Sequence, residues 1–247
     1  MREWVIDLHV HTILSPCASD EMVPPRVLHR IKQLGIDVIA ITDHNSAENV
    51  AAFMAKGREM GIGVLPGMEV QTREDIHMVC LFDTLEQVLA WQNIVYGHLP
   101  DRKNKKDSFG EQWVVDSEGN KVSEVERLLL MGTDLTLEEV VNGVHHLGGL
   151  CIAAHIDRKA FSLWGNLGFI PEDLPIDGVE LTPHLPRNQT QLNQLIKRGF
   201  YYLISSDAHW LDGLFPPQCF AAMDSCNTKA LRSALLKKDG CYIRTIR

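Results

Sequence analysis

The sequence predicts an α/β fold: a closed barrel of parallel strands with intervening helices, formed by residues 1–247 as one domain. Short apolar runs rich in β-branched residues recur along the chain, as expected for parallel strands buried on both faces. Amphipathic stretches separate several of these runs, and such strand–helix alternation is typical of βαβ units. A chain of 247 residues also has the length of one such barrel.

Each predicted element has a local justification. Seven runs are predicted as strands, because they are short and almost continuously apolar: 4–10, 36–42, 63–69, 76–82, 149–155, 177–182 and 200–206. Six stretches are predicted as helices, because their apolar residues share one face: 24–34, 47–60, 84–95, 136–147, 188–198 and 227–238. Thr84 is an acceptable N-cap for the third helix, and Thr136 with Glu139 forms a capping-box pattern for the fourth.

Residues 97–133 interrupt the strand–helix alternation. They begin with a polar, charged stretch at 101–107 and continue with a predicted hairpin, whose strands at 113–116 and 121–122 flank a turn at 117–120. We interpret this segment as an insertion at the mouth of the barrel rather than a separate domain. A substrate lid and a solvated loop both fit its composition.

The composition limits the class of protein. With 45% hydrophobic and 23% charged residues the chain is typical of globular proteins, and its net charge of -8 argues against a long nucleic-acid partner. The six cysteines are scattered without a C-x-x-C, which indicates reduced thiols and a cytoplasmic location. Residues 1–10 lack a signal-peptide pattern, and no apolar run of 18 residues predicts a membrane span.

Side chains with metal-ligand chemistry follow several of the apolar runs. They are His9 and His11, Asp43 and His44, Glu69, His155, and Asp207 and His209. Because the carboxyl ends of parallel barrel strands open on one face, residues distant in sequence converge there. Imidazole and carboxylate groups bind divalent metals. The pattern therefore predicts a polynuclear metal site, and hence an enzyme, at the C-terminal face of the strands.

These positions also have structural alternatives. His9 and His11 share one side of a strand, where two buried imidazoles without a metal would need two polar partners. Asp43 could cap the following helix and leave His44 exposed. Because the other candidate ligands accompany this pair, we favour His44 as a metal ligand and Asp43 as a hydrogen-bond acceptor that orients a neighbouring side chain. Glu69 ends an apolar run, where an unpaired carboxylate is costly, and it can bridge two metals.

Other histidines carry weaker signals. His77 differs from the candidates above because it falls near the start of its run. His184 lines the pocket or caps a strand end. Ordinary surface positions fit the remaining histidines best: His29, His98, His145 and His146.

The motifs taken together resemble those of the PHP (polymerase and histidinol phosphatase) family. They are Asp7–Thr12 (DLHVHT), Ile41–His44 (ITDH), Gly67–Glu69 (GME), Ala153–His155 (AAH) and Ser205–His209 (SSDAH), in the order of the family and over nearly the whole chain. The resemblance implies a distorted (β/α)7 TIM-like barrel with up to three metals in its C-terminal mouth. The seven predicted strands agree with that number.

The resemblance also implies ligand sets. His9, His11, Glu69 and Asp207 correspond to the ligands of the first metal. Glu69, His77 and His155 correspond to those of the second.

The third metal would take His44, His209 and a residue of the loop after the first strand. This loop departs from the family pattern, because it is lengthened over residues 12–21. Asp20 is the candidate, since Ser19-Asp20 is similar to an S-D pair of other members; Glu21 and Cys17 stay open as alternatives.

Such a site predicts hydrolysis of a phosphoester. Two or three divalent ions (Zn, Mn or Fe) would activate a bridging hydroxide for direct attack on phosphorus. Asp207, or a histidine such as His209, would protonate the leaving group, with Asp43 supporting the site.

The substrate phosphate would bind cationic groups near the mouth. Arg158, three residues past His155, is the best placed, followed by Arg187 and Lys159, with His184 as a further lining residue. A surface salt bridge is an equally ordinary role for each of these cations.

The sequence thus predicts a metal-dependent phosphoesterase acting on a small phosphorylated substrate. A monoesterase of the histidinol-phosphate or nucleotide type is slightly preferred over a nuclease-like diesterase. Two other classes remain as alternatives: a non-catalytic metal-binding regulatory module, and an amidohydrolase-like enzyme that splits C–N bonds.

Overall fold

The computed structural model describes residues 1–184 and 189–246. Within these residues the main sheet has nine strands, in the order β11-β10-β1-β2-β3-β4-β7-β8-β9. Their bounds are β1 Arg2–Val10, β2 Val38–Ile41, β3 Gly63–Gln71, β4 His77–Leu81, β7 Leu150–Ala153, β8 Gly178–Leu181, β9 Tyr202–Ile204, β10 Cys219–Met223 and β11 Tyr242–Thr245. All seven runs predicted as strands form strands.

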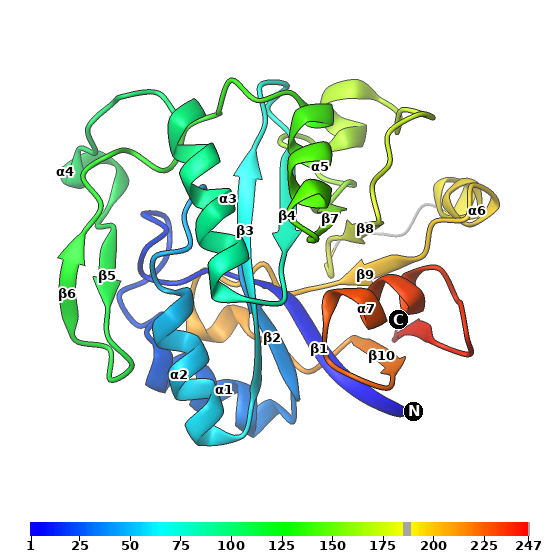
Figure 1. The fold of residues 1–247 in the computed structure, drawn as a ribbon, viewed down its shortest axis with the longest axis horizontal. Coiled ribbons are helices and arrows are strands. Elements are labelled where there is room, and N and C mark those ends of the chain that lie inside the picture. The colour runs from blue at the N-terminus through cyan, green and yellow to red at the C-terminus, as the bar shows by residue number, and fades with distance from the viewer. Residues whose placement is uncertain (185–188, 247) are drawn as a thin grey trace.

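The sheet curls into a nearly closed barrel (Figure 1). The segment after β9 lies beside β1, and Val10 forms a parallel bridge with Ala208 there. The backbone N–H of His11 donates to the carbonyl of Ala208 at 3.0 Å. The α/β barrel predicted from the sequence is therefore confirmed.

Two features of the sheet differ from the prediction of an all-parallel barrel. β4 is antiparallel to both β3 and β7. Only residues 72–76 separate β3 from β4, whereas a parallel pair needs a crossover of roughly a dozen residues or more. In addition, the unpredicted strands β10 and β11 extend the sheet beyond β1 by antiparallel pairing.

Helices cover the outside of the barrel. Those predicted are present as α1 Pro24–Leu34, α2 Val50–Met60, α3 Leu85–His98, α5 Leu137–His146, α6 Gln189–Lys197 and α7 Thr228–Leu235; residue 188, the predicted start of α6, lies outside the described residues. Thr84 and Thr136 both form complete capping boxes, as predicted for Thr136. None of the described helices combines the length and apolarity needed to cross a bilayer.

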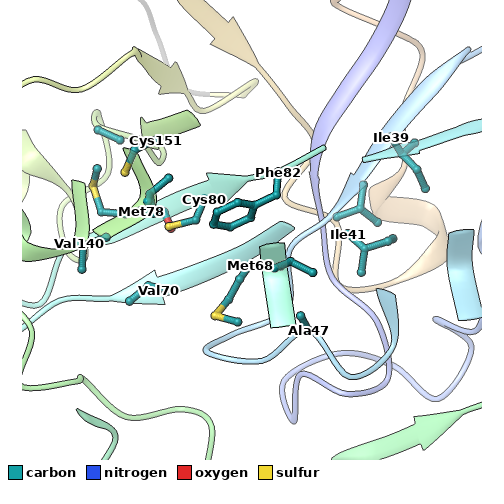
Figure 2. Packing of buried hydrophobic residues seen from close by; sticks show 14 of the residues in the cluster. Ile39, Ile41, Ala47, Met68, Val70, Met78, Cys80, Phe82, Val140 and Cys151 are labelled. Carbon is teal, nitrogen blue, oxygen red and sulfur yellow. The ribbon is translucent and has the colours of Figure 1, made fainter. Parts of the chain in front are cut away.

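In β2, β4 and β7 alternate residues enter two apolar clusters, as the period-two geometry of strands requires. In β4, Met78 and Cys80 belong to an outer cluster that packs between the sheet and the helices (Figure 2). Val79 and Leu81 belong to an inner cluster, to which strands around the barrel contribute and which α7 joins. Membership of the inner cluster therefore identifies the side chains that face the interior of the barrel.

A bulge in β1 changes which of its side chains face inward. The register pairs Ile6 with Val38, Asp7 with Ile39 and Val10 with Ile41, so β1 holds one extra residue. Ile6 and Leu8 lie in the inner cluster and Val10 in the outer one. The alternation therefore shifts within the bulge, and His9 and His11 point inward.

The predicted insertion is fixed to the barrel by buried contacts. It contains the short helix α4 (Lys106–Phe109) and a hairpin of β5 (Trp113–Val115) and β6 (Lys121–Glu124), which stands beside α2 and α3 in Figure 1. The Asn49 side chain donates to the Trp113 carbonyl and accepts from the Val115 N–H. The Asn45 side chain, next to His44, donates to the carbonyls at 129 and 131.

Helix packing gives a test of this arrangement. A Cβ on Gly143 of α5 would lie 2.5 Å from the Trp91 ring of α3, whereas a Cβ on Gly97 of α3 would meet nothing within 4 Å. We predict that Gly143→Ala lowers the free energy of unfolding by about 1–3 kcal/mol through overpacking. Gly97→Ala should raise it, by up to about 1 kcal/mol. Urea unfolding of both variants measures the difference; equal stabilities would contradict the packing of α5 on α3.

Candidate metal centre

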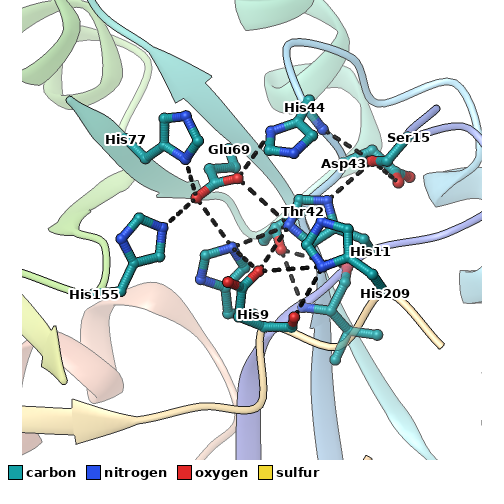
Figure 3. A network of polar contacts seen from close by, with 12 residues as sticks. His9, His11, Ser15, Thr42, Asp43, His44, Glu69, His77, His155 and His209 are labelled. Carbon is teal, nitrogen blue, oxygen red and sulfur yellow. Dashed lines mark hydrogen bonds and ion pairs between the residues drawn. The ribbon is translucent and has the colours of Figure 1, made fainter. Parts of the chain in front are cut away.

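The inner face of the barrel ends in a cluster of imidazoles and carboxylates (Figure 3). It unites every predicted ligand except Asp20: His9, His11, His44, Glu69, His77, His155, Asp207 and His209. The carboxyl ends of β1, β2, β7 and β9, together with β3, supply all of these side chains but one.

His77 is the exception, because it is the first residue of β4. Since β4 is antiparallel to β3, its amino end lies beside the carboxyl end of β3, and His77 pairs with Gln71. Strand direction thus explains a position that the sequence alone left anomalous.

The carboxylate of Glu69 lies at the middle of the cluster and is almost fully buried. Its Oε1 atom is 3.2 Å from Nε2 of His9, 2.9 Å from Nδ1 of His77 and 3.1 Å from Nε2 of His155. Its Oε2 atom is 2.9 Å from Nδ1 of His44 and 3.4 Å from Nε2 of His11. One carboxylate therefore contacts five imidazoles, as a group shared between cations would.

Three ligand atoms form a triangle whose edges match those of a tetrahedral metal site, and both carboxylate oxygens of Glu69 lie beside this triangle. Nε2 of His9 and Nε2 of His11 are 3.2 Å apart. Oδ1 of Asp207 lies 3.3 Å from Nε2 of His9 and 3.2 Å from Nε2 of His11. Oε1 of Glu69 lies 3.2 Å from Nε2 of His9, and its Oε2 lies 3.4 Å from Nε2 of His11. Ligand bonds of about 2.0–2.1 Å give tetrahedral edges of about 3.3–3.4 Å. The residues present fit a divalent ion.

Hydrogen bonds orient the imidazoles with a free nitrogen toward the centre. Nδ1 of His9 is 3.0 Å from Oε1 of Glu180. Nδ1 of His11 is 2.9 Å from the Ser15 hydroxyl, which donates to Asp43 at 2.6 Å. In their neutral forms, with the Nδ1 protons donated in this way, both Nε2 atoms would present lone pairs to each other, an arrangement that a cation between them stabilises.

The charge state of the cluster also suits metal binding. Burial, followed by the charge of His11, lowers the pKa of His44 to about 4 and that of His209 to about 3, so neither holds a proton that a metal must displace. Burial alone would lower the pKa of His11, but the nearby carboxylates of Asp207 and Glu69 raise it to about 9. A metal at His11 would therefore bind with release of a proton.

Two carboxylate atoms of the cluster have no hydrogen-bond donor: Oε2 of Glu69 and Oδ1 of Asp207 are buried and accept no hydrogen bond. Buried charged oxygens of this kind are costly unless a cation compensates them. Among the described residues, three sets lie close enough to share an ion: His9, His11 and Glu69; His44, Glu69 and His77; and His11, His44 and His209.

A family model described as PHP domain matches residues 7–167. The chain belongs to the PHP domain family. The chain is 36% identical over 203 residues to an uncharacterised protein of Methanocaldococcus jannaschii, a match that covers 77% of this chain and 91% of that protein.

Solved structures share the fold. One is the lesion-specific endonuclease PfuEndoQ of Pyrococcus furiosus, with a TM-score of 0.72, 19% identity and coverage of 98% of this chain. The chain covers only 58% of that longer chain. Another is described as a proposed metal-dependent phosphoesterase of Bifidobacterium adolescentis, with a TM-score of 0.59, 17% identity, and coverage of 94% of this chain and 96% of that one.

The loop after β1 is the part of the predicted site that the structure supports least. The Asp20 side chain is exposed, and it belongs to none of the ligand groups found among the described residues. Glu21 forms an ion pair with Arg26 at 2.9 Å. Cys17 is exposed, and like Asp20 it belongs to none of the ligand groups found among the described residues. A third-metal ligand from this loop remains a prediction.

The predicted phosphate-binding residues differ in their position relative to the cluster. The Arg158 guanidinium lies 2.5 Å from Oδ2 of Asp207, at the edge of the cluster. Lys159 is exposed. The exposed His184 ring contacts the ring of Phe215, with centroids 5.6 Å apart. Arg187 lies outside the described residues.

Sequence reasoning missed two residues that support the ligands. Glu180 of β8 is buried and contacts His9; its signal was a carboxylate inside an apolar run, DGVELT, which no ligand motif marked. Ser15 connects His11 to Asp43, and nothing in its sequence context distinguishes it from an ordinary loop serine. Asp43 itself reaches His11 only through Ser15, which agrees with an orienting role rather than contact with substrate.

Glu180 provides a test of how the cluster holds metal. We predict that Glu180→Ala weakens Zn²⁺ or Mn²⁺ binding by about 10- to 100-fold, because His9 loses the acceptor that fixes its ring and tautomer. Glu180→Gln keeps an acceptor oxygen and should lose less. Competition with a coloured chelator measures both affinities; wild-type affinity in a folded Glu180→Ala variant would remove Glu180 from the centre.

Proposed function

We propose that this PHP domain is a metal-dependent phosphoesterase that hydrolyses a small phosphorylated substrate at the Glu69 cluster. The main support is that one buried carboxylate contacts five imidazoles, while an arginine lies at the edge of the same cluster. Phosphoester hydrolysis uses such a combination, because divalent cations and a guanidinium both bind phosphoryl oxygens.

The residues of the cluster fall into two groups of metal ligands that share Glu69. His9, His11, Glu69 and Asp207 would hold one ion, and Glu69 with His77 and His155 a second. When bound, such ions lower the pKa of a coordinated water to near neutrality and take up charge from phosphoryl oxygens.

Asp207 and Arg158 connect the metal centre to the substrate phosphate. Oδ1 of Asp207 faces His9 and His11, and its Oδ2 faces the Arg158 guanidinium. Arg158 is partly exposed, so its remaining N–H groups are available to a phosphate entering from solvent. His209 donates from Nδ1 to the Asp207 carbonyl at 2.9 Å, which leaves a lone pair on its Nε2.

The type of ester is the finer part of the proposal. We retain the slight preference for a monoester of a small molecule, because the chain has a net charge of -8 and a long polyanion would be repelled. A nuclease-type diesterase is the second candidate, since the fold is shared with a lesion-specific endonuclease.

The proposal is tested by hydrolysis of a chromogenic phosphate monoester and the matching diester, with Mn²⁺ or Zn²⁺ added and with a chelator as control. We expect metal-dependent turnover that falls by orders of magnitude in Asp207→Ala, because this variant removes a ligand and the partner of Arg158. The ratio of the two rates identifies the ester. Metal-loaded protein that hydrolyses neither ester, but cleaves an amide, would contradict the proposal.

Arg158 allows a second prediction. We expect Arg158→Ala to lower kcat/KM for a phosphoester by about 10- to 100-fold, the loss of a hydrogen bond between charged groups. Lys159→Ala removes the same charge from the neighbouring exposed position and should have a much smaller effect. Equal losses in the two variants would indicate a general field effect and not a phosphate contact.

A further inference from the structure

A row of five rings crosses the metal centre. The Phe161 and His77 centroids are 4.9 Å apart, those of His77 and His44 5.3 Å, those of His44 and His209 5.8 Å, and those of His209 and Trp210 6.3 Å. The inner three rings are candidate ligands, which Figure 3 shows around Glu69. The two outer rings are aromatic side chains outside the ligand set.

Both outer rings are open to solvent, in contrast to the buried His44 and His77 between them. Phe161 is 44% exposed and Trp210 is 58% exposed. Such large apolar side chains bury most of their surface when their role is only to fill a core. The row is therefore buried at its centre and bounded at each end by an accessible aromatic face.

Phe161 is moreover held in place against a conformational cost. Its φ angle is +56°, a region in which a bulky side chain is rarely found. Its carbonyl accepts a hydrogen bond from the His77 N–H at 3.1 Å, and its ring stacks on the His77 ring with 24° between the planes. A strained backbone that keeps an exposed aromatic face beside a metal ligand points to a role in binding.

The segment that carries Phe161 also carries other groups of the site. His155 is a candidate ligand, and Arg158 contacts Asp207. Ser162 is buried, and its hydroxyl donates to the Arg158 carbonyl at 2.6 Å. This hydrogen bond restrains the backbone of residues 158–162. Phe161 thus follows Arg158 by three residues, and Trp210 follows Asp207, the partner of Arg158, by three residues.

We propose that Phe161 and Trp210 are stacking faces for unpaired nucleobases, so that the phosphoester cleaved at this centre belongs to a nucleotide. This inference rests on the proposed function and specifies its substrate class. Aromatic side chains bind bases of any sequence through their π faces. A mononucleotide would use one face, and a phosphodiester between two unpaired nucleotides would use both. The acidic chain favours such short substrates over a long duplex.

The test compares substrates with and without bases, in the wild type and in variants of the two aromatic residues. kcat/KM is measured for a mononucleotide and a dinucleotide, and for the same compounds with each base replaced by an abasic sugar. In the wild type, removal of the bases should lower kcat/KM by about 5- to 150-fold per stacked base. In Trp210→Ala and Phe161→Ala the same removal should cost clearly less, because the stacking partner is already absent.

Three variants separate stacking from structural support. Trp210→Phe and Phe161→Tyr keep an aromatic face and should restore most of the preference for base-bearing substrates. Phe169→Ala removes an exposed aromatic side chain that is outside the row, and it should preserve the preference in full. Metal content is measured for each variant, so that a displaced His77 or His209 is detected directly.

Two results would overturn the inference. One is wild-type hydrolysis of base-free and base-bearing substrates at equal efficiency. The other is a loss in Phe161→Ala and Trp210→Ala that is the same for both substrates. In either case the phosphoesterase proposal would stand, whereas metal-loaded protein that hydrolyses none of these compounds would contradict that proposal itself.

Discussion

The arrangement of the site depends on the position of one buried carboxylate. Glu69 contacts imidazoles from β1, from β4 and from the segments that follow β2 and β7. Its backbone is fixed as firmly as its side chain, because its N–H donates to the Asp43 carbonyl and its own carbonyl accepts from Asn45. A buried carboxylate surrounded by imidazoles is stable only with compensating positive charge, supplied by protons or by metal ions.

Two irregularities of the barrel make this convergence possible. The bulge in β1 turns His9 and His11 to the inner face, and the antiparallel direction of β4 brings His77 to the mouth. A regular all-parallel barrel with the same sequence would direct His9 outward and leave His77 at the opposite end. Departures from regular geometry thus occur where ligands are placed, as is common near active sites.

The sequence predicted much of this structure because the relevant signals are local. Apolar runs located the strands, and H-x-H, D-H and D-A-H motifs located His9, His44 and Asp207. The direction of β4 and the bulge depend on connection length and strand register, which periodicity does not report. Glu180 and Ser15 were missed because neither residue lies in a motif of its own, and their role is set by contacts with His9 and His11 that only the folded chain shows. Asp20 was chosen by analogy, and its exposed side chain gives that choice no support.

The most direct test of this account is the number of metal ions bound by Glu69→Gln, which keeps the shape of the side chain and removes its charge. Elemental analysis after dialysis should find about two to three ions per wild-type chain, and the same number in Glu126→Gln, whose exposed carboxylate pairs with Lys103 outside the cluster. We predict that folded Glu69→Gln loses more than one ion, because the carboxylate is shared between sites. Wild-type stoichiometry and affinity in that variant would contradict the central role of Glu69.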